Sequence, residues 1–387
     1  MAESRKRKYD EAALRTLTRD DLEALEIGAG ILGTGGGGNP YQGKLLALEA
    51  LKAGYEMKIL ATDAIEADAL CMSIGGIGAP VVGVERMREG REGLRCLTAM
   101  EELIRTPVDA IVCEEIGGAN SMSPLVTAAL GGLPILDCDG MGRAFPEMQM
   151  TTFSIYGHSS TPSVMCDLHG NTVIFSHAVS EVWHERMARA CVVAQGGGAM
   201  LATAPMQAHF VHQFAIPRSY TKAIALGEAV IRARRQQEDP IAAVCDLEGG
   251  RRIFNGKITD LKRHLRGGFA VGDLELSGFD GWAGETASVA IQNEFLIFRR
   301  NGVVEVTVPD LIVLLDVDTG YPITTEMLRY GQRVAVIAIP CHDLLRSSAA
   351  LEVVGPAAFG YPDIPFQPLP KPAAAHAKTT SETAPAA

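Results

Sequence analysis

The stretch Ile135-Leu-Asp-Cys-Asp-Gly-Met-Gly-Arg-Ala-Phe-Pro-Glu147 begins as an apolar segment and ends in acids, a thiol and glycines. An earlier stretch, Val108-Asp-Ala-Ile-Val-Cys-Glu-Glu-Ile-Gly-Gly-Ala-Asn-Ser121, has the same pattern. Buried strands that deliver polar groups at their carboxyl ends are typical of ligand sites in α/β proteins. We therefore predict that these two strand ends face one pocket.

Strand and helix patterns alternate along the N-terminal part of the chain. Expected strands at 57–60, 69–74, 108–112 and 134–136 are separated by expected helices at 41–53, 85–106 and 123–130. Such alternation is typical of an α/β protein whose parallel sheet is covered on both faces. Ligands bind outside the carboxyl ends of such strands, and these ends carry Gly75–Pro80, Glu114–Ser121 and Asp137–Arg143.

The C-terminal part has a different pattern. From about residue 250 to 341, short β-prone segments such as Ala287–Arg299 are separated by turns such as Arg300-Asn-Gly302. This pattern predicts an antiparallel barrel or sandwich. Between the two parts, Met148–Tyr156 is β-prone, and Ser219–Gln236 is expected to be an amphipathic helix capped by Ser219.

Composition excludes several classes of protein. The 387 residues include 47% hydrophobic residues and carry a formal net charge of -11, which favours a folded protein and argues against nucleic acid as a partner. The eight cysteines form no Cys-x-x-Cys pair, and Met1 to Asp20 contain no apolar core. No apolar run reaches the ~18 residues of a membrane span. We expect a cytoplasmic protein without a membrane partner, and a homo-oligomer on general grounds.

A glycine-rich segment, Gly28-Ala-Gly-Ile-Leu-Gly-Thr-Gly-Gly-Gly-Gly-Asn-Pro40, follows an expected helix. A dinucleotide-binding motif needs a strand before its glycines, so that interpretation is disfavoured. We expect a loop whose backbone amides bind an anion or a carbonyl group, followed by a helix that begins at Asn39-Pro40. The candidate substrate-binding residues here are Gly36, Gly37 and Asn39, with Gly78 on the next glycine-rich turn; a loop needed only for packing is the alternative.

Four separated motifs resemble one family. They are GTGGGGNPY at 33–41, EEIGGANS at 114–121, DGMGRAFPE at 139–147 and VGPAAFGY at 354–361. Together they resemble the S-methyl thiohydantoin desulfurase family, which is associated with hydantoinase and oxoprolinase systems. The resemblance implies an N-terminal three-layer α/β domain and a C-terminal β-rich swivelling domain. We place these at residues 17–170 and 171–362, with a disordered tail at 363–387.

The resemblance also implies a reaction. One branch of the family resembles desulfhydrases of ergothioneine degradation, which convert 3-(5-oxo-2-thioxoimidazolidin-4-yl)propionate into the corresponding hydantoin and release hydrogen sulfide. Cys138 and His169 depart from the commoner family residues. A cyclic-amide hydrolase of the hydantoin or oxoproline type and a non-catalytic subunit of a hydantoinase complex are the alternatives.

Replacing C=S by C=O requires a water molecule activated by a base or by a metal ion. Glu115 and Asp139 are the candidates for this step, with an ion pair or a cap at a strand end as the alternative. Thiolate chemistry favours zinc, and Asp137, Cys138 and His158 are the candidate ligands. Because strand residues alternate, Asp137 and Asp139 share one face and Cys138 lies on the other.

The remaining candidates are polar groups that would hold the small-molecule substrate. Arg143 is a candidate catalytic residue because a guanidinium group fits a ring carbonyl or a carboxylate. A salt bridge to Glu147 is its alternative role. Asn120 and Ser121 are candidates for hydrogen bonds to the amide edge of the ring, or for capping the helix that begins near Ser123.

Overall fold

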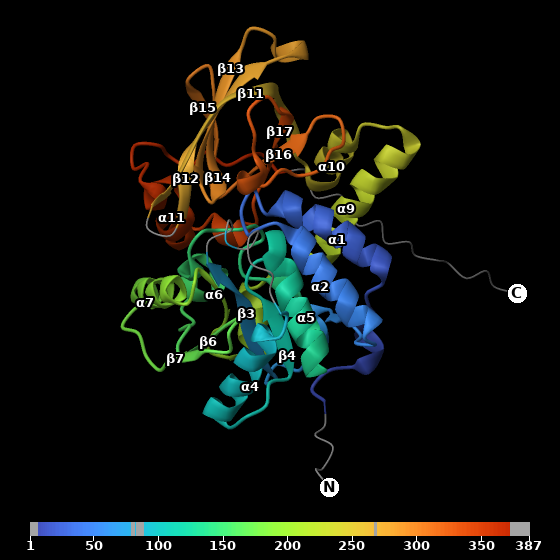
Figure 1. Ribbon diagram of the computed structural model, residues 1–387, viewed down its shortest axis with the longest axis vertical. Coiled ribbons are helices and arrows are strands. Elements are labelled where there is room, and N and C mark those ends of the chain that lie inside the picture. The colour runs from blue at the N-terminus through green and yellow to red at the C-terminus, as the bar shows by residue number, and fades with distance from the viewer. Residues whose placement is uncertain (1–6, 79–81, 83–88, 267–268, 372–387) are drawn as a thin grey trace, which may run out of the picture.

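The computed structural model describes residues 7–78, 82, 89–266 and 269–371 of the chain. Two sheets form the framework, and the antiparallel one lies above the mixed one in Figure 1. Of the segments discussed above, 1–6, 79–80, 85–88 and 372–387 lie outside the described residues.

The first sheet is built around four parallel strands. Its strands run in the order β1 (Leu14–Thr16), β2 (Lys58–Leu60), β5 (Ile135–Asp139), β4 (Ala110–Cys113), β3 (Leu70–Gly78), β8 (Gly198–Ala202), β6 (Ser163–Asp167) and β7 (Thr172–Phe175). Two short strands, β9 (Met206–Gln207) and β10 (Ile216–Pro217), pair with β3 and β5. The central strands β2, β5, β4 and β3 pair in parallel, whereas the flanking pairs are antiparallel. The predicted α/β class is confirmed.

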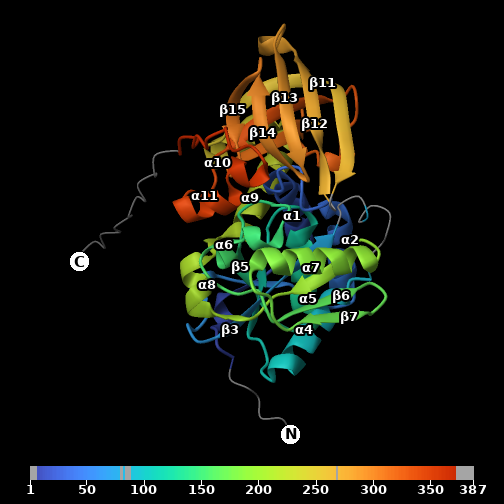
Figure 2. The same ribbon diagram turned by 90° about the vertical axis from the view of Figure 1, so that its left-hand side faces the viewer.

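Helices cover both faces of this sheet (Figures 1 and 2). One side carries α1 (Arg19–Leu32), α2 (Pro40–Lys52), α4 (Glu92–Ile104), α5 (Met122–Gly131) and α9 (Ser219–Gln236), and the other carries α6 (Thr152–Ile155), α7 (Glu181–Ala194) and α8 (Ala208–Phe214). Helix α1 begins at the N-cap Thr18, whose hydroxyl accepts from the Asp21 backbone N–H while the Asp21 carboxylate accepts from the Thr18 backbone. Helix α10 (Pro240–Glu248) follows α9 and leads into the second sheet.

The second sheet is antiparallel and curls into a half-barrel (Figure 2). Its order is β15 (Val303–Thr307), β14 (Glu294–Arg300), β13 (Thr286–Gln292), β12 (Phe269–Gly278), β11 (Arg251–Arg266), β17 (Arg333–Ile339) and β16 (Leu311–Asp316). Phe254, Phe295 and Phe298 lie in its buried core. Helix α11 (Ser348–Val354) ends the regular structure before η8 (Pro356–Phe359). The predicted barrel-like, β-rich C-terminal part is confirmed.

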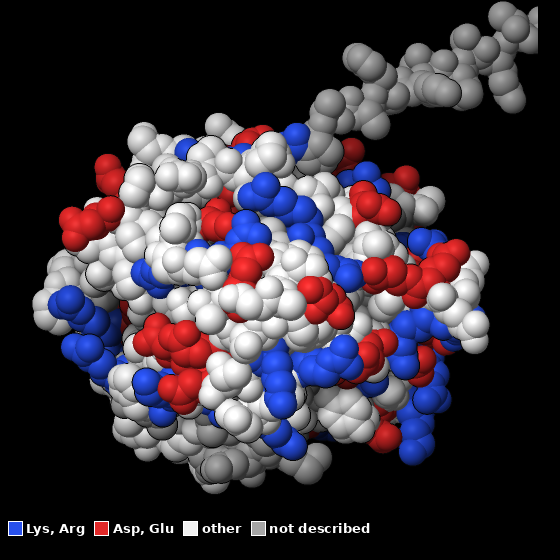
Figure 3. Space-filling view, turned by 90° about the horizontal axis from the view of Figure 1, so that it is seen from above, with Lys and Arg blue, Asp and Glu red and all other residues white. Residues whose placement is uncertain are grey.

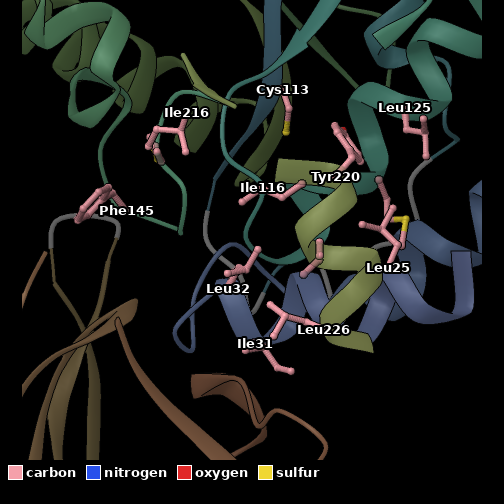
Figure 4. Close-up of a cluster of buried hydrophobic side chains, with 14 of the residues drawn as sticks. Leu25, Ile31, Leu32, Cys113, Ile116, Leu125, Phe145, Ile216, Tyr220 and Leu226 are labelled. Atoms are coloured by element: carbon pink, nitrogen blue, oxygen red, sulfur yellow. The ribbon is translucent and has the colours of Figure 1, made fainter. Parts of the chain in front are cut away.

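One hydrophobic cluster contains residues of both parts. Figure 4 shows side chains of α1, α5 and α9 packed together, with Phe145 at one side. The same cluster includes Leu296 and Val313 of the second sheet. Helices α1 and α9 meet so closely that a Cβ atom on Gly28 would lie 1.7 Å from the carbonyl oxygen of Ala223. Glycine is therefore required at this crossing.

Three local predictions were wrong. The β-prone segment 148–156 forms the short helices η4 (Met148–Met150) and α6. The expected strand Ala287–Arg299 is two strands, β13 and β14, joined at Asn293, which has a positive φ of 56°. Ser219 does not cap α9, because Arg218 is the N-cap and the Ser219 hydroxyl is bonded elsewhere.

The domain boundary at residue 170 remains a prediction. Four strands that follow it in the sequence, β7, β8, β9 and β10, belong to the first sheet.

Charge on the face formed by the second sheet is mixed. Figure 3 shows basic and acidic side chains interspersed over this face. In the part of the chain that the structure describes, no helix has both the length and the apolar character needed to cross a bilayer.

Candidate functional site

A cavity of about 440 Å³ lies where the two parts meet. The first part supplies the glycine-rich loop, the end of β3, the segment after β4 and the segment before η4, and the second part supplies the turn before β14. The sequence-predicted residues that line this cavity are Gly37, Asn39, Gly78, Glu115 and Asn120. The segments after β4 and β5 therefore meet at one cavity.

Glu115 lies in the cavity wall with both oxygens hydrogen-bonded. The Asn120 amide donates to Oε1 at 2.6 Å, and the backbone N–H of Phe145 donates to Oε2 at 3.1 Å. Asn120 is itself held by Gly76 of β3, whose N–H donates to Asn120 Oδ1 at 2.7 Å. Burial raises the pKa of Glu115 to about 8, against the opposing effect of these two hydrogen bonds.

Glu114 also lines the cavity. The hydroxyl of Ser73 on β3 donates to Glu114 Oε2. Burial raises the pKa of Glu114 to about 7, and the nearby Glu181 adds to the shift. Adjacent residues usually point in opposite directions in a strand, but β4 ends at Cys113, so both glutamates lie beyond the alternating region.

A third carboxyl group reaches the cavity from the second sheet. Glu294, the first residue of β14, is 1% exposed. Its side chain lies against the backbone of Gly36, where an added Cβ atom would lie 1.8 Å from Glu294 Oε1. Burial raises the pKa of Glu294 well above its ordinary value, and Glu115 adds to the shift. Gly36 thus acts by leaving room for this carboxyl group.

Glu147 and Arg189 also line the cavity. Burial raises the pKa of Glu147, and the hydrogen bond from the Gln149 amide opposes the shift. Arg189 Nε donates to Glu185 Oε1 at 2.6 Å, and Arg189 Nη2 donates to the carbonyl of Pro146 at 3.1 Å. Its guanidinium group also lies 4.8 Å from the ring centre of Phe269, on the second sheet. Among the described residues, Arg189 is the only basic side chain that lines the cavity.

Asp139 lies behind the cavity rather than in its wall. One oxygen accepts from the Ser219 hydroxyl, and the other accepts from the backbone N–H groups of Ile116, Met141 and Gly142 at 2.9, 3.1 and 2.7 Å. Asp139 is fully buried, and burial raises its pKa to about 6 despite these bonds. Its hydrogen bonds hold the segments after β4 and β5 against α9.

Asp137 and Cys138 point to opposite faces of β5, as strand alternation predicts. The Asp137 carboxylate accepts from the backbone N–H and hydroxyl of Thr221, in the first turn of α9. Cys138 packs in an apolar cluster with Leu136, and burial raises its pKa well above the usual value. A thiol with this environment is a poor source of thiolate.

The predicted zinc ligands are not brought together. His158 Nε2 lies 2.8 Å from the carbonyl oxygen of Ala204, and its ring packs against Phe210. Within the described ranges, no group of three or more His, Cys, Asp or Glu side chains is arranged to hold a metal ion. Asp137, Cys138 and His158 therefore do not fit a single metal site.

Arg143 is fully buried and bridges the two parts. Its Nη1 donates to the carbonyl groups of Pro309 and Asp310, both at 3.0 Å, and Nη2 donates to the Thr34 hydroxyl at 2.7 Å and to the Phe295 carbonyl at 3.5 Å. Its Nε donates to the Ala144 carbonyl at 3.0 Å. These contacts occupy all five N–H groups, which leaves none for a substrate or for Glu147. Ser121 is likewise buried outside the cavity wall and donates to the Gly118 carbonyl.

Sequence reasoning missed Glu114, Glu294 and Arg189 as site residues. Glu114 is the residue before Glu115, which was a candidate. Glu294 belongs to the polar run Gln292-Asn293-Glu294, which interrupts a mostly apolar β-prone segment, and that interruption was an available signal. Arg189 lies on α7 among other charged residues, and nothing in its local pattern distinguishes it.

Comparisons with known proteins agree with the fold. A family model described as "S-Me-THD-like, N-terminal domain" matches residues 20–177, and a second described as "S-Me-THD-like, C-terminal domain" matches residues 179–369. A crystal structure of a protein from Chromobacterium violaceum, a structural-genomics target, aligns with 92% of this chain and 99% of its own, with 21% identity and a TM-score of 0.75. A search of curated proteins finds no match.

Proposed function

Because the chain belongs to the S-Me-THD-like family, we propose that it hydrolyses the carbon–sulfur double bond of a thiohydantoin ring. The proposed substrate is 3-(5-oxo-2-thioxoimidazolidin-4-yl)propionate, and the products are the hydantoin propionate and hydrogen sulfide. The observation that supports this proposal is the wall of buried carboxyl groups around one cavity, two of which have a pKa of about 7 and about 8.

Carboxyl groups of this kind can exchange protons at neutral pH. A general base works best when its pKa lies near the working pH, and such a base accelerates a reaction by roughly 10²–10⁴-fold. Glu114 has the lower of the two pKa values, so its carboxylate is the more populated at neutral pH. We assign to Glu114 the removal of a proton from the attacking water, and to Glu115 the binding of a ring N–H beside it.

The other cavity residues support binding of the substrate. Gly37, Gly38 and the start of α2 line the cavity. We assign the propionate carboxylate to Arg189, because two of its five N–H groups remain after its bonds to Glu185, Gly78 and Pro146.

The experiment that tests this proposal is product analysis with the purified full chain. We expect sulfide in equal amount to a product that keeps its ring. The kcat should be at least roughly 10²-fold lower in Glu114→Gln, and it should fall less in Glu115→Gln, whose amide oxygen can still accept a hydrogen bond. Glu305→Gln is the control, because Glu305 pairs with Arg300 on the second sheet, outside the cavity wall. A ring-opened product would instead indicate a cyclic-amide hydrolase. Failure of the full chain to turn over would favour a non-catalytic subunit.

A further inference from the structure

Glu294 is the one carboxyl group in the cavity wall that comes from the second sheet, among the described residues. The turn that carries it is fixed to the glycine-rich loop by backbone hydrogen bonds. The Phe295 N–H donates to the Thr34 carbonyl at 2.8 Å. Thr325 of η6 (Thr325–Met327) adds a bridge, because its N–H donates to the Gly35 carbonyl at 2.8 Å and its hydroxyl donates to the Asn293 carbonyl at 2.8 Å. The position of Glu294 relative to the first sheet is therefore set by the backbone of both parts.

The chemical state of Glu294 follows from its surroundings. Burial favours the neutral acid, and the charged groups that face it are Glu115 in the cavity wall and Arg143 behind the loop. Glu115 reinforces the rise in the pKa of Glu294, and Arg143 opposes it. Arg143 forms no ion pair with Glu294, because its N–H groups all donate to other partners. On balance these surroundings raise the pKa of Glu294, which favours its protonated form.

One oxygen of Glu294 is without a partner. In the described part of the chain, Oε2 is buried and makes no hydrogen bond, either as donor or as acceptor. A buried polar atom without a partner costs about 1–3 kcal/mol, and such atoms in native proteins call for an explanation. Glu294 also lines the cavity, so a ligand bound there is the available partner.

We propose that Glu294 is the acid that donates a proton to the substrate sulfur. This inference rests on the proposed desulfurisation and adds a residue to it. Water attacks the thiocarbonyl carbon and loses a proton to Glu114, while the C=S π electrons move to sulfur, which takes the proton of Glu294. The resulting carbon bears one OH and one SH group.

Collapse of this intermediate restores both residues. The OH proton passes to the Glu294 carboxylate as the C=O bond forms and the C–S bond breaks. The departing HS⁻ takes the proton held by Glu114 and leaves as H₂S. The balance is one water consumed and one H₂S released for each C=S converted to C=O. The acid comes from the second sheet and the base from the first, so the reaction requires both parts of the chain.

The test is steady-state kinetics of Glu294→Gln in the full chain, with sulfide as the readout across pH. Gln keeps the shape and can donate a hydrogen bond, but it cannot transfer a proton. We expect a fall in kcat of about 100-fold or more, a KM within about threefold of the wild type, and loss of the alkaline limb of the pH profile. Glu294→Asp, which keeps the proton at a shorter reach, should retain more activity than Glu294→Gln.

Several outcomes would overturn the assignment. A Glu294→Gln kcat within threefold of the wild type would do so, as would a lower kcat with an unchanged pH profile. If Glu294→Gln does not fold, the pH profile of Glu294→Asp provides the test. Its alkaline limb should lie at a different pH from that of the wild type, because the acid that donates the proton has changed; an unchanged limb would overturn the assignment. Absence of sulfide from the wild-type protein would refute the proposed function itself. Glu305→Gln is again the control.

Discussion

Replacing Arg143 by Met should separate a structural role from a substrate-binding role. Met removes every donor but keeps much of the volume. Four strong acceptors, the carbonyls of Ala144, Pro309 and Asp310 and the Thr34 hydroxyl, would then be left buried without this partner. At about 1 kcal/mol or more for each unpaired group, the free energy of unfolding should fall by about 4 kcal/mol.

Urea denaturation can follow this loss in each part of the molecule. The chain has two tryptophans, Trp183 on α7 and Trp282 beside the second sheet, so single-tryptophan variants report on the parts separately. Because Arg143 bridges the parts, we expect both fluorescence transitions to move to lower urea. Arg232→Met is the control, since Arg232 is an exposed residue of α9.

A loss of less than about 1 kcal/mol in Arg143→Met would refute the structural interpretation. Kinetics provide the complementary test. Folded Arg143→Met should keep a KM within threefold of the wild type, because no Arg143 donor is left for a ligand. A tenfold higher KM with unchanged stability would instead show that Arg143 contacts the substrate.

Three further predictions concern other residues. Gly36→Ala should displace the Glu294 carboxyl group, and we expect a kcat loss comparable to that of Glu294→Gln, with destabilisation of about 1–3 kcal/mol in urea. Asp137→Ala should remove the bonds to Thr221 and lower the free energy of unfolding by about 1–2 kcal/mol, without changing the metal content measured by mass spectrometry. The pKa of Glu115 rises from 4.5 to about 8 on folding, so stability should decrease as pH rises from 4.5 to 8, and Glu115→Gln should flatten this decrease by up to about 1.4 kcal/mol per pH unit.

The architecture could be predicted because it depends on local periodicity. Alternating apolar segments gave the parallel strands β3, β4 and β5, and strand alternation placed Asp137 and Cys138 on opposite faces. The prediction for residues 148–156 was wrong because tertiary contacts override the β-prone composition of this segment. It packs against α7 and α11 and forms short helices there.

The sequence predicted only those site residues that lie close together along the chain. Glu115 and Asn120 belong to a single turn after β4, so their proximity is encoded there. The sequence pattern made Asp139 as good a candidate as Glu115. In the structure, however, the start of α9, about 80 residues later in the chain, covers Asp139, and the Ser219 hydroxyl donates to its carboxylate. Glu294 reaches the cavity from a sheet that is distant in sequence; the local pattern marks an interrupted strand there, but it does not indicate which cavity the carboxyl group enters.

Hydrolysis of the thiohydantoin propionate in ¹⁸O-labelled water is the most direct test of the proposed reaction. We expect one ¹⁸O atom in the hydantoin product, as the carbonyl oxygen on the ring carbon that carried sulfur, and one H₂S for each product molecule. Both signals should fall together in Glu114→Gln and Glu294→Gln. Product with ¹⁸O in a new carboxylate and the sulfur still on the ring fragment, or no product from the wild-type protein, would contradict hydrolytic desulfurisation at this cavity.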